Sequence, residues 1–405
     1  MTTMAIDNKD KKVLNVPHLR FPEFSGEWKK HSLGEIGETI IGLTYKPSDV
    51  VDNNGIIVFR SSNIKNGMID YSDLVRVNKH IKDKIITKEN DILVCARNGS
   101  QRLIGKNAII KQEDANNTFG AFMMVYRAND NPFILPLLST KKYFSQVGEN
   151  LGARINQITT SDFNGFEFYF PENHAERTKI AELFRLLDER IATQNKIIDK
   201  LQSLIRGINQ YAFTNTGINY KLGEICEIRS GYSGNQLTLK NGLKVSRIET
   251  ISGHKVNMER VGYVAPFESS ENYRLQIGDI LFSNINSVEY IGNTAFIDKD
   301  YNLYHGMNLL RLIPKKELVM PFYLYLVLNT NRLLNHFKTV CNKAVSQASI
   351  NQTELGKTIV RIPNLMNQNR ICELFQTLYT KLEAERYFIS LLQDQKQHLL
   401  RQMFI

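Results

Sequence analysis

The clearest hydrophobic pattern in the chain is a pair of long apolar stripes that advance by alternating steps of three and four residues. The first stripe, within residues 173–213, consists of Ile180, Phe184, Leu187, Ile191, Gln194, Ile198 and Leu201 and continues to Ala212. The second, within residues 364–405, consists of Ile371, Phe375, Leu378, Leu382, Glu385, Ile389 and Leu392. A mean spacing of about 3.5 residues is typical of a coiled-coil seam. At about 1.5 Å per residue, each stripe predicts a helix roughly 60 Å long.

The two stripes carry a polar residue at the same position, Gln194 in the first and Glu385 in the second. Two interpretations stay open for this position. The residue is either a tolerated polar side chain near solvent, or a registry device that discourages slipped helix pairing at some cost in stability. Lys396 interrupts the second stripe near its end.

Outside the stripes, short apolar runs between Gly, Asn and Asp turns predict β-strands with a few short helices. The strand-like runs are residues 56–59, 91–95 and 166–170 in the first half, and 243–245, 279–282 and 358–362 in the second. Residues 133–144 and 321–337 are predicted to be helical. A proline closes the last strand of each half, and a long helix follows. Asn173 and Glu176 form a predicted capping pair at the first helix start, and Asn364 takes the equivalent place in the second.

These elements occur twice, about 190 residues apart. Ile-Ala-Glu-Leu-Phe at 180–184 corresponds to Ile-Cys-Glu-Leu-Phe at 371–375, and Asn-Asp-Ile-Leu at 90–93 corresponds to Gly-Asp-Ile-Leu at 278–281. Leu-Gly-Glu-Ile occurs unchanged at 33–36 and 222–225, and Ile-Gly at 104–105 corresponds to Ile-Gly at 291–292. Such a duplication predicts two similar domains and a target with two parts.

The predicted fold class is α+β, with two repeated mixed domains separated by two long antiparallel coiled-coil helices and related by a pseudo-twofold axis. The expected organisation is a disordered tail over residues 1–16, a first domain over 17–172, a first helix over 173–213, a second domain over 214–363 and a second helix over 364–405.

The composition is that of an ordinary globular protein with a basic balance. Of 405 residues, 42% are hydrophobic and 23% are charged, and the formal net charge is +10. The larger share of the positive excess falls in residues 214–363. This balance fits a nucleic-acid partner, although alone it decides little. Because no apolar run approaches the ~20 residues that span a bilayer, and the first twelve residues lack the apolar core of a signal peptide, we expect a cytoplasmic protein without membrane contact.

No catalytic or metal-binding pattern stands out. The four cysteines are scattered without a C-x-x-C pair, which indicates reduced thiols and no zinc site. Asn-Pro-Phe at 131–133 lacks the second proline of an amino-methyltransferase motif. The glycines at 99 and 105 are one residue too far apart for a P-loop, and Asn107 replaces its Ser or Thr. The eight histidines are isolated, so we expect a non-catalytic chain without a metal or cofactor of its own.

Several segments together resemble the specificity subunits of type I restriction–modification systems. Phe-Pro-Glu-Phe-Ser-Gly-Glu-Trp at 21–28, followed by Leu-Gly-Glu-Ile, is similar to the opening of these subunits. Residues 90–93 with 104–106 are similar to the family's Gly-Asp-Ile-Leu strand and glycine loop. The stretch from Gln157 to Pro171, with the helix behind it, is similar to the end of a target-recognition domain and its spacer. The resemblance covers residues 17–405, and it departs from the family pattern at Asn90 and in the glycine-free loop at 286–290.

The resemblance implies a non-catalytic subunit in which each domain recognises one half of a bipartite, asymmetric double-stranded DNA site, while the two helices fix the gap. It also implies two methyltransferase subunits, which bind S-adenosylmethionine and methylate one adenine in each half-site, and two restriction–translocase subunits, which use ATP and Mg. Half-sites on one face of B-DNA lie about 34 Å apart, a separation that helices of the predicted length can span. The alternative is a standalone duplicated scaffold protein, joined by a coiled coil, whose loops bind another polymer or a protein.

Polar turns supply the donors and acceptors that base recognition needs. In the first domain the candidate DNA-binding residues are Arg60, Ser61, Ser62, Asn63, Arg97, Asn98, Ser100, Gln101 and Arg102; in the second they are Ser246, Arg247, Asn284, Asn286 and Ser287. Arg154, Lys343 and Gln347 are candidates for phosphate contacts. Because the segments differ between the copies, the half-sites should differ in sequence. The alternative for each residue is a polar turn that only caps a strand in solvent.

Overall fold

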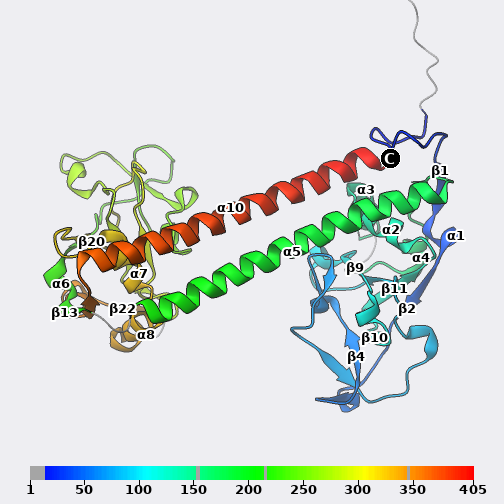
Figure 1. The fold of residues 1–405 in the computed structure, drawn as a ribbon, viewed down its shortest axis with the longest axis horizontal. Coiled ribbons are helices and arrows are strands. Elements are labelled where there is room, and N and C mark those ends of the chain that lie inside the picture. The colour runs from blue at the N-terminus through cyan, green and yellow to red at the C-terminus, as the bar shows by residue number, and fades with distance from the viewer. Residues whose placement is uncertain (1–13, 152–155, 214–216, 344–346) are drawn as a thin grey trace, which may run out of the picture. The chain divides into compact units, whose positions relative to one another are not determined.

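A computed structural model of the chain describes residues 14–151, 156–213, 217–343 and 347–405 (Figure 1). The contacts divide the chain into two compact units, Met1–Asn195 with Tyr387–Ile405, and Lys196–Arg386. We call these the first and the second unit. Most of the predicted tail, residues 1–13, and the candidate Arg154 lie outside the described residues.

The first unit is built around two four-stranded sheets. One sheet has the order β2 (Glu38–Ile41), β11 (Met123–Arg127), β8 (Ile92–Cys95) and β9 (Asn107–Ile109), with all neighbours antiparallel. The other has the order β10 (Thr118–Phe119), β4 (Ile56–Phe59), β7 (Val75–Val77) and β3 (Val50–Val51). Two strand pairs are β1 (Lys29–Ser32) with β12 (Glu167–Phe170), and β5 (Ile64–Lys65) with β6 (Met68–Ile69). The short helices are α1 (Leu33–Ile36), α2 (Asn131–Leu137), α3 (Lys141–Leu151) and α4 (Thr160–Asn164).

The second unit repeats this plan. Its antiparallel sheet has the order β14 (Cys226–Ser230), β20 (Leu309–Pro314), β17 (Ile280–Ser283) and β19 (Thr294–Phe296). The smaller sheets are β13 (Ile218–Lys221) with β23 (Ile359–Ile362), β15 (Leu243–Val245) with β16 (Gly262–Val264), and β18 (Ile285–Asn286), β22 (Ala348–Ser349) and β21 (Asn342–Lys343) in that order. The short helices are α6 (Leu222–Ile225), α7 (Pro321–Leu328), α8 (Asn331–Val340) and α9 (Gln352–Gly356).

The stretches at 133–144 and 321–337 are helical as predicted, and each consists of two helices, α2 with α3 and α7 with α8. The break comes at a threonine in both copies. The Thr330 hydroxyl accepts a hydrogen bond from the Leu333 N–H (3.4 Å), and the Thr140 hydroxyl accepts one from the Tyr143 N–H (3.3 Å). A threonine in this role starts a new helix, because it satisfies an N–H that has no partner within the helix.

A buried ion pair fixes the register of the main sheet in both units. The Asp91 carboxylate, at the start of β8, accepts hydrogen bonds from Arg127 on β11 at 2.8 and 2.7 Å. In the second unit Asp279 pairs with Arg311 on β20 at 2.7 Å. Burial raises the pKa of Asp279, while the Gln276 N–H and then Arg311 act against this rise. Because a buried charge without its partner is strongly destabilising, each pair ties two neighbouring strands together.

Two turns in each unit require left-handed backbone. Asn90 (φ 67°) and Gly278 (φ 101°) precede the buried aspartates. Asparagine tolerates this region, so the departure from the family glycine at Asn90 keeps the turn. Gly105 (φ 81°) and Gly292 (φ 83°) close the next loop, and an added Cβ would lie 3.1 Å from an aromatic side chain of α3 in the first unit and 2.6 Å from one of α8 in the second.

Two long helices, α5 (His174–Ala212) and α10 (Leu365–Met403), contribute a segment to each unit (Figure 1). In the first unit they pack antiparallel, with the rings of Phe184 and Phe404 5.7 Å apart and an ion pair between Asp188 and Lys396. Lys396 therefore interrupts the apolar stripe without being left unpaired. In the second unit the end of α5 packs on the start of α10 and on α7, through a cluster that includes Ile205 and Phe375.

The stripe residues predicted for the two helices are all buried or partly buried. Gln194 is 5% exposed, so the interpretation of a polar residue near solvent is wrong for this side chain. Glu385 is also largely covered, with a side chain 12% exposed, and it forms an ion pair with Lys381. A role for this polar position in helix registry stays a prediction.

The start of α5 is fastened by a buried carboxylate. Glu176 is 0% exposed and accepts hydrogen bonds from Arg20 Nε and Nη2, both at 2.7 Å, and from Trp28 Nε1 at 3.3 Å. Asn173 Oδ1 caps the helix by accepting from the Ala175 N–H at 2.9 Å. The predicted capping role of Glu176 was therefore wrong, because this side chain accepts hydrogen bonds from Arg20 and Trp28 instead.

One residue beyond the equivalent position, α10 buries a neutral side chain instead. Gln368 is 1% exposed, and its Oε1 accepts from the Met320 N–H at 2.7 Å. Its Nε2 donates to the carbonyls of Leu318 and Pro363 at 3.1 and 2.8 Å. Near the start of its long helix, one copy thus buries a charged carboxylate, and the other buries a neutral amide whose oxygen and nitrogen both have hydrogen-bond partners.

Candidate nucleic-acid interface

Each domain has a 3-10 turn that begins at an arginine, directly after β4 in the first domain and after β15 in the second. We call these the arginine-led turns. In the first domain Asn63 Oδ1 accepts from the Arg60 N–H at 2.8 Å; in the second, Thr250 Oγ1 accepts from the Arg247 N–H at 2.9 Å. These matching bonds align Arg60 with Arg247. The candidate Ser246 lies one residue before this turn.

Two of the predicted DNA-binding residues are buried and make their hydrogen bonds inside the fold. Asn63 is 0% exposed, and its Nδ2 donates to the carbonyls of Asp70 and Asp73 at 3.0 and 2.8 Å. Ser246 is also 0% exposed, and its hydroxyl accepts from the Gly306 N–H at 3.0 Å. Since their hydrogen bonds are made inside the fold, the prediction that these two side chains contact DNA was wrong.

In the first domain, hydrogen bonds join the two predicted DNA-binding segments, residues 60–63 and 97–102. Asn98 Nδ2 donates to the Ser61 hydroxyl at 2.9 Å, and Asn98 Oδ1 accepts from the Ser100 N–H at 2.9 Å. We call residues 60–62 with 97–102 the first loop pair. Its exposed side chains are those of Ser62, Arg97, Gln101 and Arg102.

The arginines of the candidate set differ in whether a carboxylate holds them. Arg60 pairs with Asp73 at 2.8 Å, and Arg247 with Glu249 at 3.5 Å. Within the described ranges, no carboxylate forms an ion pair with Arg97 or Arg102. These two guanidinium groups therefore have the charge and the exposure to bind a phosphate or a base edge.

In the second domain the sheet of β18, β22 and β21 brings the predicted segments together. Asn286 and Lys343 both pair with Ala348 in this sheet. Asn286 is engaged locally, because its Nδ2 donates to the Ser283 hydroxyl and its Oδ1 accepts from the Ser287 N–H. Asn284 donates to the Ile350 carbonyl at 3.3 Å. The exposed candidates in this region are Ser287, Lys343 and Gln347, whereas Arg247 lies on a separate turn behind β15.

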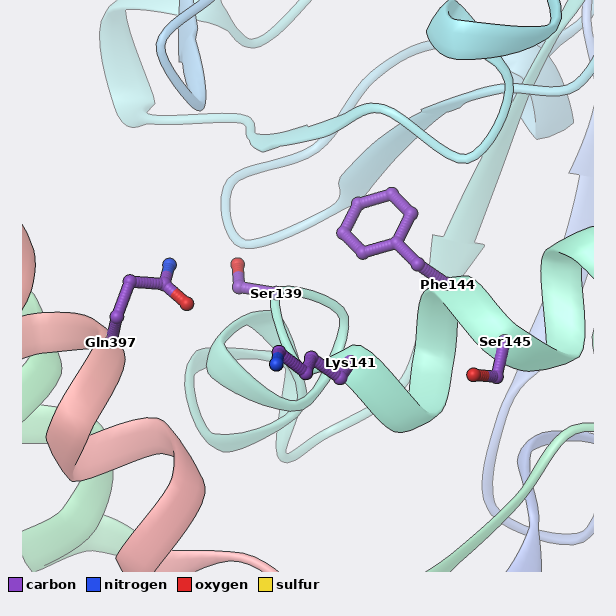
Figure 2. A pocket seen from close by; sticks show the side chains of 5 residues that line it. All are labelled: Ser139, Lys141, Phe144, Ser145 and Gln397. Atoms are coloured by element: carbon purple, nitrogen blue, oxygen red, sulfur yellow. The ribbon is translucent and has the colours of Figure 1, made fainter.

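The described residues contain no group of three His, Cys, Asp or Glu side chains that could hold a metal ion. A cavity of about 490 Å³ lies between α3 and α10 in the first unit, lined by Ser139, Lys141, Phe144, Ser145 and Gln397. Figure 2 shows that Phe144 and Ser145 point away from each other, and Lys141 is the one ionisable residue of this lining. No helix among the described residues is long and apolar enough to cross a membrane.

The chain thus contains the same scaffold twice, and the exposed polar loops differ between the two copies. The family model for the type I restriction modification DNA specificity domain matches residues 25–203 and again residues 218–388. The chain therefore belongs to the type I restriction–modification DNA specificity family and carries its domain twice.

Named relatives agree with this family. The chain is 38% identical over 188 residues to a putative type I restriction enzyme MjaX specificity subunit of Methanocaldococcus jannaschii. That match covers 45% of this chain and 44% of the relative, so it spans less than half of that protein. The EcoKI specificity subunit of Escherichia coli K12 is 23% identical over 384 residues, which cover 87% of this chain and 82% of the relative.

Solved structures support the fold. The S subunit of a type I restriction–modification system from M. genitalium matches with a TM-score of 0.60 at 17% identity, over 96% of this chain and 99% of that chain. A chain from a study of complex assembly in the type I system matches with a TM-score of 0.55 at 18% identity, over 92% and 96%. The predicted α+β fold with two repeated domains is confirmed. The chain is a DNA sequence-recognition subunit, and it is not the catalytic component of its system.

Proposed function

We propose that the two domains recognise the two halves of a bipartite, asymmetric double-stranded DNA site, and that the long helices set the unread gap between them. The observation that supports the proposal is that the scaffold is repeated, while the exposed side chains of the candidate loops differ between the copies. The buried Asp–Arg pairs, the left-handed turns and the arginine-led turns recur in both copies. The exposed side chains of the candidate DNA-binding loops do not recur.

The exposed positions differ in chemistry between the copies. The bridge that pairs Arg97 with Gln157 in the first domain corresponds to the β18–β22 pair of Ile285 with Ser349 in the second. A cation in one copy thus corresponds to an apolar residue in the other. Since base recognition depends on donors, acceptors and apolar contacts at defined places, different side chains on one scaffold should select different bases.

The proposal includes partners. We propose that two methyltransferase subunits dock on the chain and bring S-adenosylmethionine, so that one adenine in each half-site is methylated at N6. Two restriction–translocase subunits, with ATP and Mg, would complete the endonuclease. Relatives that are specificity subunits of type I restriction enzymes support this assembly, as does the structural neighbour from a study of complex assembly. The proposal places the chain in the cytoplasm with its DNA.

The test identifies the half-site that the first domain recognises. N6-methyladenine is mapped in DNA from cells that express a type I methyltransferase subunit with the native chain, with Arg97→Ala or with Lys343→Ala. Arg97→Ala should relax or abolish recognition in one half of the motif, whereas Lys343→Ala, a phosphate contact, should lower methylation without changing the preferred bases.

Two results would contradict the proposal. One is a native motif that consists of a single continuous half. The other is an Arg97→Ala variant that changes bases in both halves. A chain that leaves the methylation map unchanged while co-purifying with the methyltransferase subunit would instead favour the scaffold alternative.

A further inference from the structure

An aromatic side chain stands exposed beside the first loop pair, and the fold holds it in place. Phe122, in the turn between β10 and β11, is 59% exposed. Its carbonyl oxygen accepts hydrogen bonds from the N–H groups of Ala96 and Arg97, both at 3.0 Å. The backbone of Phe122 is therefore fixed relative to the first loop pair, and its ring is accessible to a ligand bound at this loop pair.

Arg97 lies directly over this ring. Its guanidinium carbon is 5.2 Å from the ring centroid of Phe122, within the range of a cation–π contact. The backbone of Arg97 is held as well, through a bridge to Gln157, and the next residue is bonded to Ser61. Stacking on the ring restricts the guanidinium to few orientations while its N–H groups stay exposed, and no carboxylate in the described residues competes for them.

We propose that Arg97 and Phe122 act as one base-recognition unit of the first domain, in which the guanidinium binds guanine and the ring packs on the neighbouring base. A guanidinium donates two parallel hydrogen bonds to guanine N7 and O6 in the major groove. The ring edge or face offers apolar contact to a thymine methyl group or to a base plane. This inference rests on the proposed DNA-reading function and adds the residues and one target base.

The second domain lacks this unit, which makes the inference specific to one half-site. Gly120 and Gly306 occupy equivalent bridges, so Asn308 takes the place of Phe122. Ile285 takes the place of Arg97, as the matching strand pairs show. The polar and apolar members have exchanged places, so the second domain cannot recognise guanine at this position in the same way.

The test measures how well the chain distinguishes its own half-site from a scrambled one, because a residue with a merely structural role would not change this preference. The chain, in complex with its methyltransferase subunit, is titrated against a duplex that carries the mapped site and against one with the first half-site scrambled. The ratio of the two affinities is the readout. Phe122→Ala and Arg97→Ala should each lower this ratio about tenfold, the size expected for one base contact, and Phe122→Tyr should restore most of it.

A double-mutant cycle tests whether the two residues form one unit. The Arg97→Ala/Phe122→Ala variant should lower the ratio no more than about threefold beyond either single variant. The matched control is Ile277→Ala, which removes a side chain of equal exposure, 59%, from the second domain and should leave the ratio unchanged.

An unchanged ratio for Phe122→Ala, an equal loss of affinity for both duplexes, or fully additive losses in the double variant would overturn the inference. Failure of the native chain to distinguish the two duplexes would instead refute the proposed function, so the two failures are separable.

Discussion

Removal of the buried carboxylate of Glu176 should destabilise the first unit alone. Glu176→Ala leaves the Trp28 indole N–H without its acceptor and leaves the Arg20 guanidinium, whose side chain is 15% exposed, without its anion. Arg20 keeps two acceptors, the carbonyls of Ser25 and Gly26 at 3.0 and 2.6 Å.

The expected loss follows from this geometry. Breaking a buried ion pair by removing one partner costs about 3–5 kcal/mol. Because Arg20 retains two carbonyl acceptors and some solvent contact, we expect the lower end, about 3 kcal/mol. For a unit of this size, each kcal/mol shifts the melting temperature by about 2–4 °C, so the transition should move down by about 6–12 °C.

The chain carries its own probe for this experiment. Trp28 is its single tryptophan and is 1% exposed, between Phe133 and Phe404 at 6.3 Å each. Tryptophan emission during urea or thermal unfolding therefore reports the first unit. The matched control is Gln368→Glu, which places a carboxylate against the Leu318 and Pro363 carbonyls of the second unit. It should destabilise that unit and leave the tryptophan transition in place.

A loss of less than about 1 kcal/mol in the free energy of unfolding of Glu176→Ala, followed by tryptophan emission, would contradict this expectation. The expectation would also be refuted if Gln368→Glu moved the tryptophan transition as far as Glu176→Ala does. Either result would mean that the buried carboxylate does not hold the opening segment on α5.

Three further predictions concern the loops and the core. Gly292→Ala should lower the free energy of unfolding by more than the about 1–2 kcal/mol that a left-handed residue costs. It should also cost more than Gly105→Ala, because its Cβ would lie 2.6 Å rather than 3.1 Å from an aromatic side chain. Thermal unfolding of the two variants tests this order, and the reverse order would contradict it. Burial raises the pKa of Cys226 to about 12 and of Cys95 and Cys372 to about 11, so a thiol reagent at pH 8 should react with the native chain far more slowly than with the unfolded one. Since the folded thiols keep their protons to higher pH than unfolded ones, stability should fall as the pH rises above about 9, and denaturant titrations from pH 8 to 11 check the sign. Asn63→Ala should lower the free energy of unfolding by about 1–3 kcal/mol without changing the recognised bases, and a changed methylation motif would contradict its interior role.

The long helices could be predicted from the sequence because their signal is local. Their apolar residues recur every three or four positions, and the helix geometry alone places them on one face. The duplication, in turn, predicted which strands would correspond. Thr140 and Thr330 start a new helix without interrupting the apolar pattern, so the pattern alone does not show where each helical stretch divides.

The partners of single polar residues could not be predicted in the same way. Glu176 matched a capping pattern, but its partner Arg20 lies 156 residues away in the sequence. Asn63 and Ser246 stand in polar turns beside exposed neighbours, and only the packed structure shows that they face inward. Phe122 was missed because an aromatic residue beside a strand is normally assigned to the core. Its exposure, and its contact with Arg97, depend on how two distant loops meet.

The function proposed for this chain is to give a type I methyltransferase its DNA sequence specificity. The most direct measurement is N6-methyladenine mapping in cells that express the chain with a type I methyltransferase subunit, compared with cells that express the methyltransferase subunit alone. We expect one bipartite motif with a fixed gap, methylated on one adenine in each half and only when the chain is present. The same methylation in both cultures, although the chain co-purifies with the methyltransferase subunit, would contradict the proposed function.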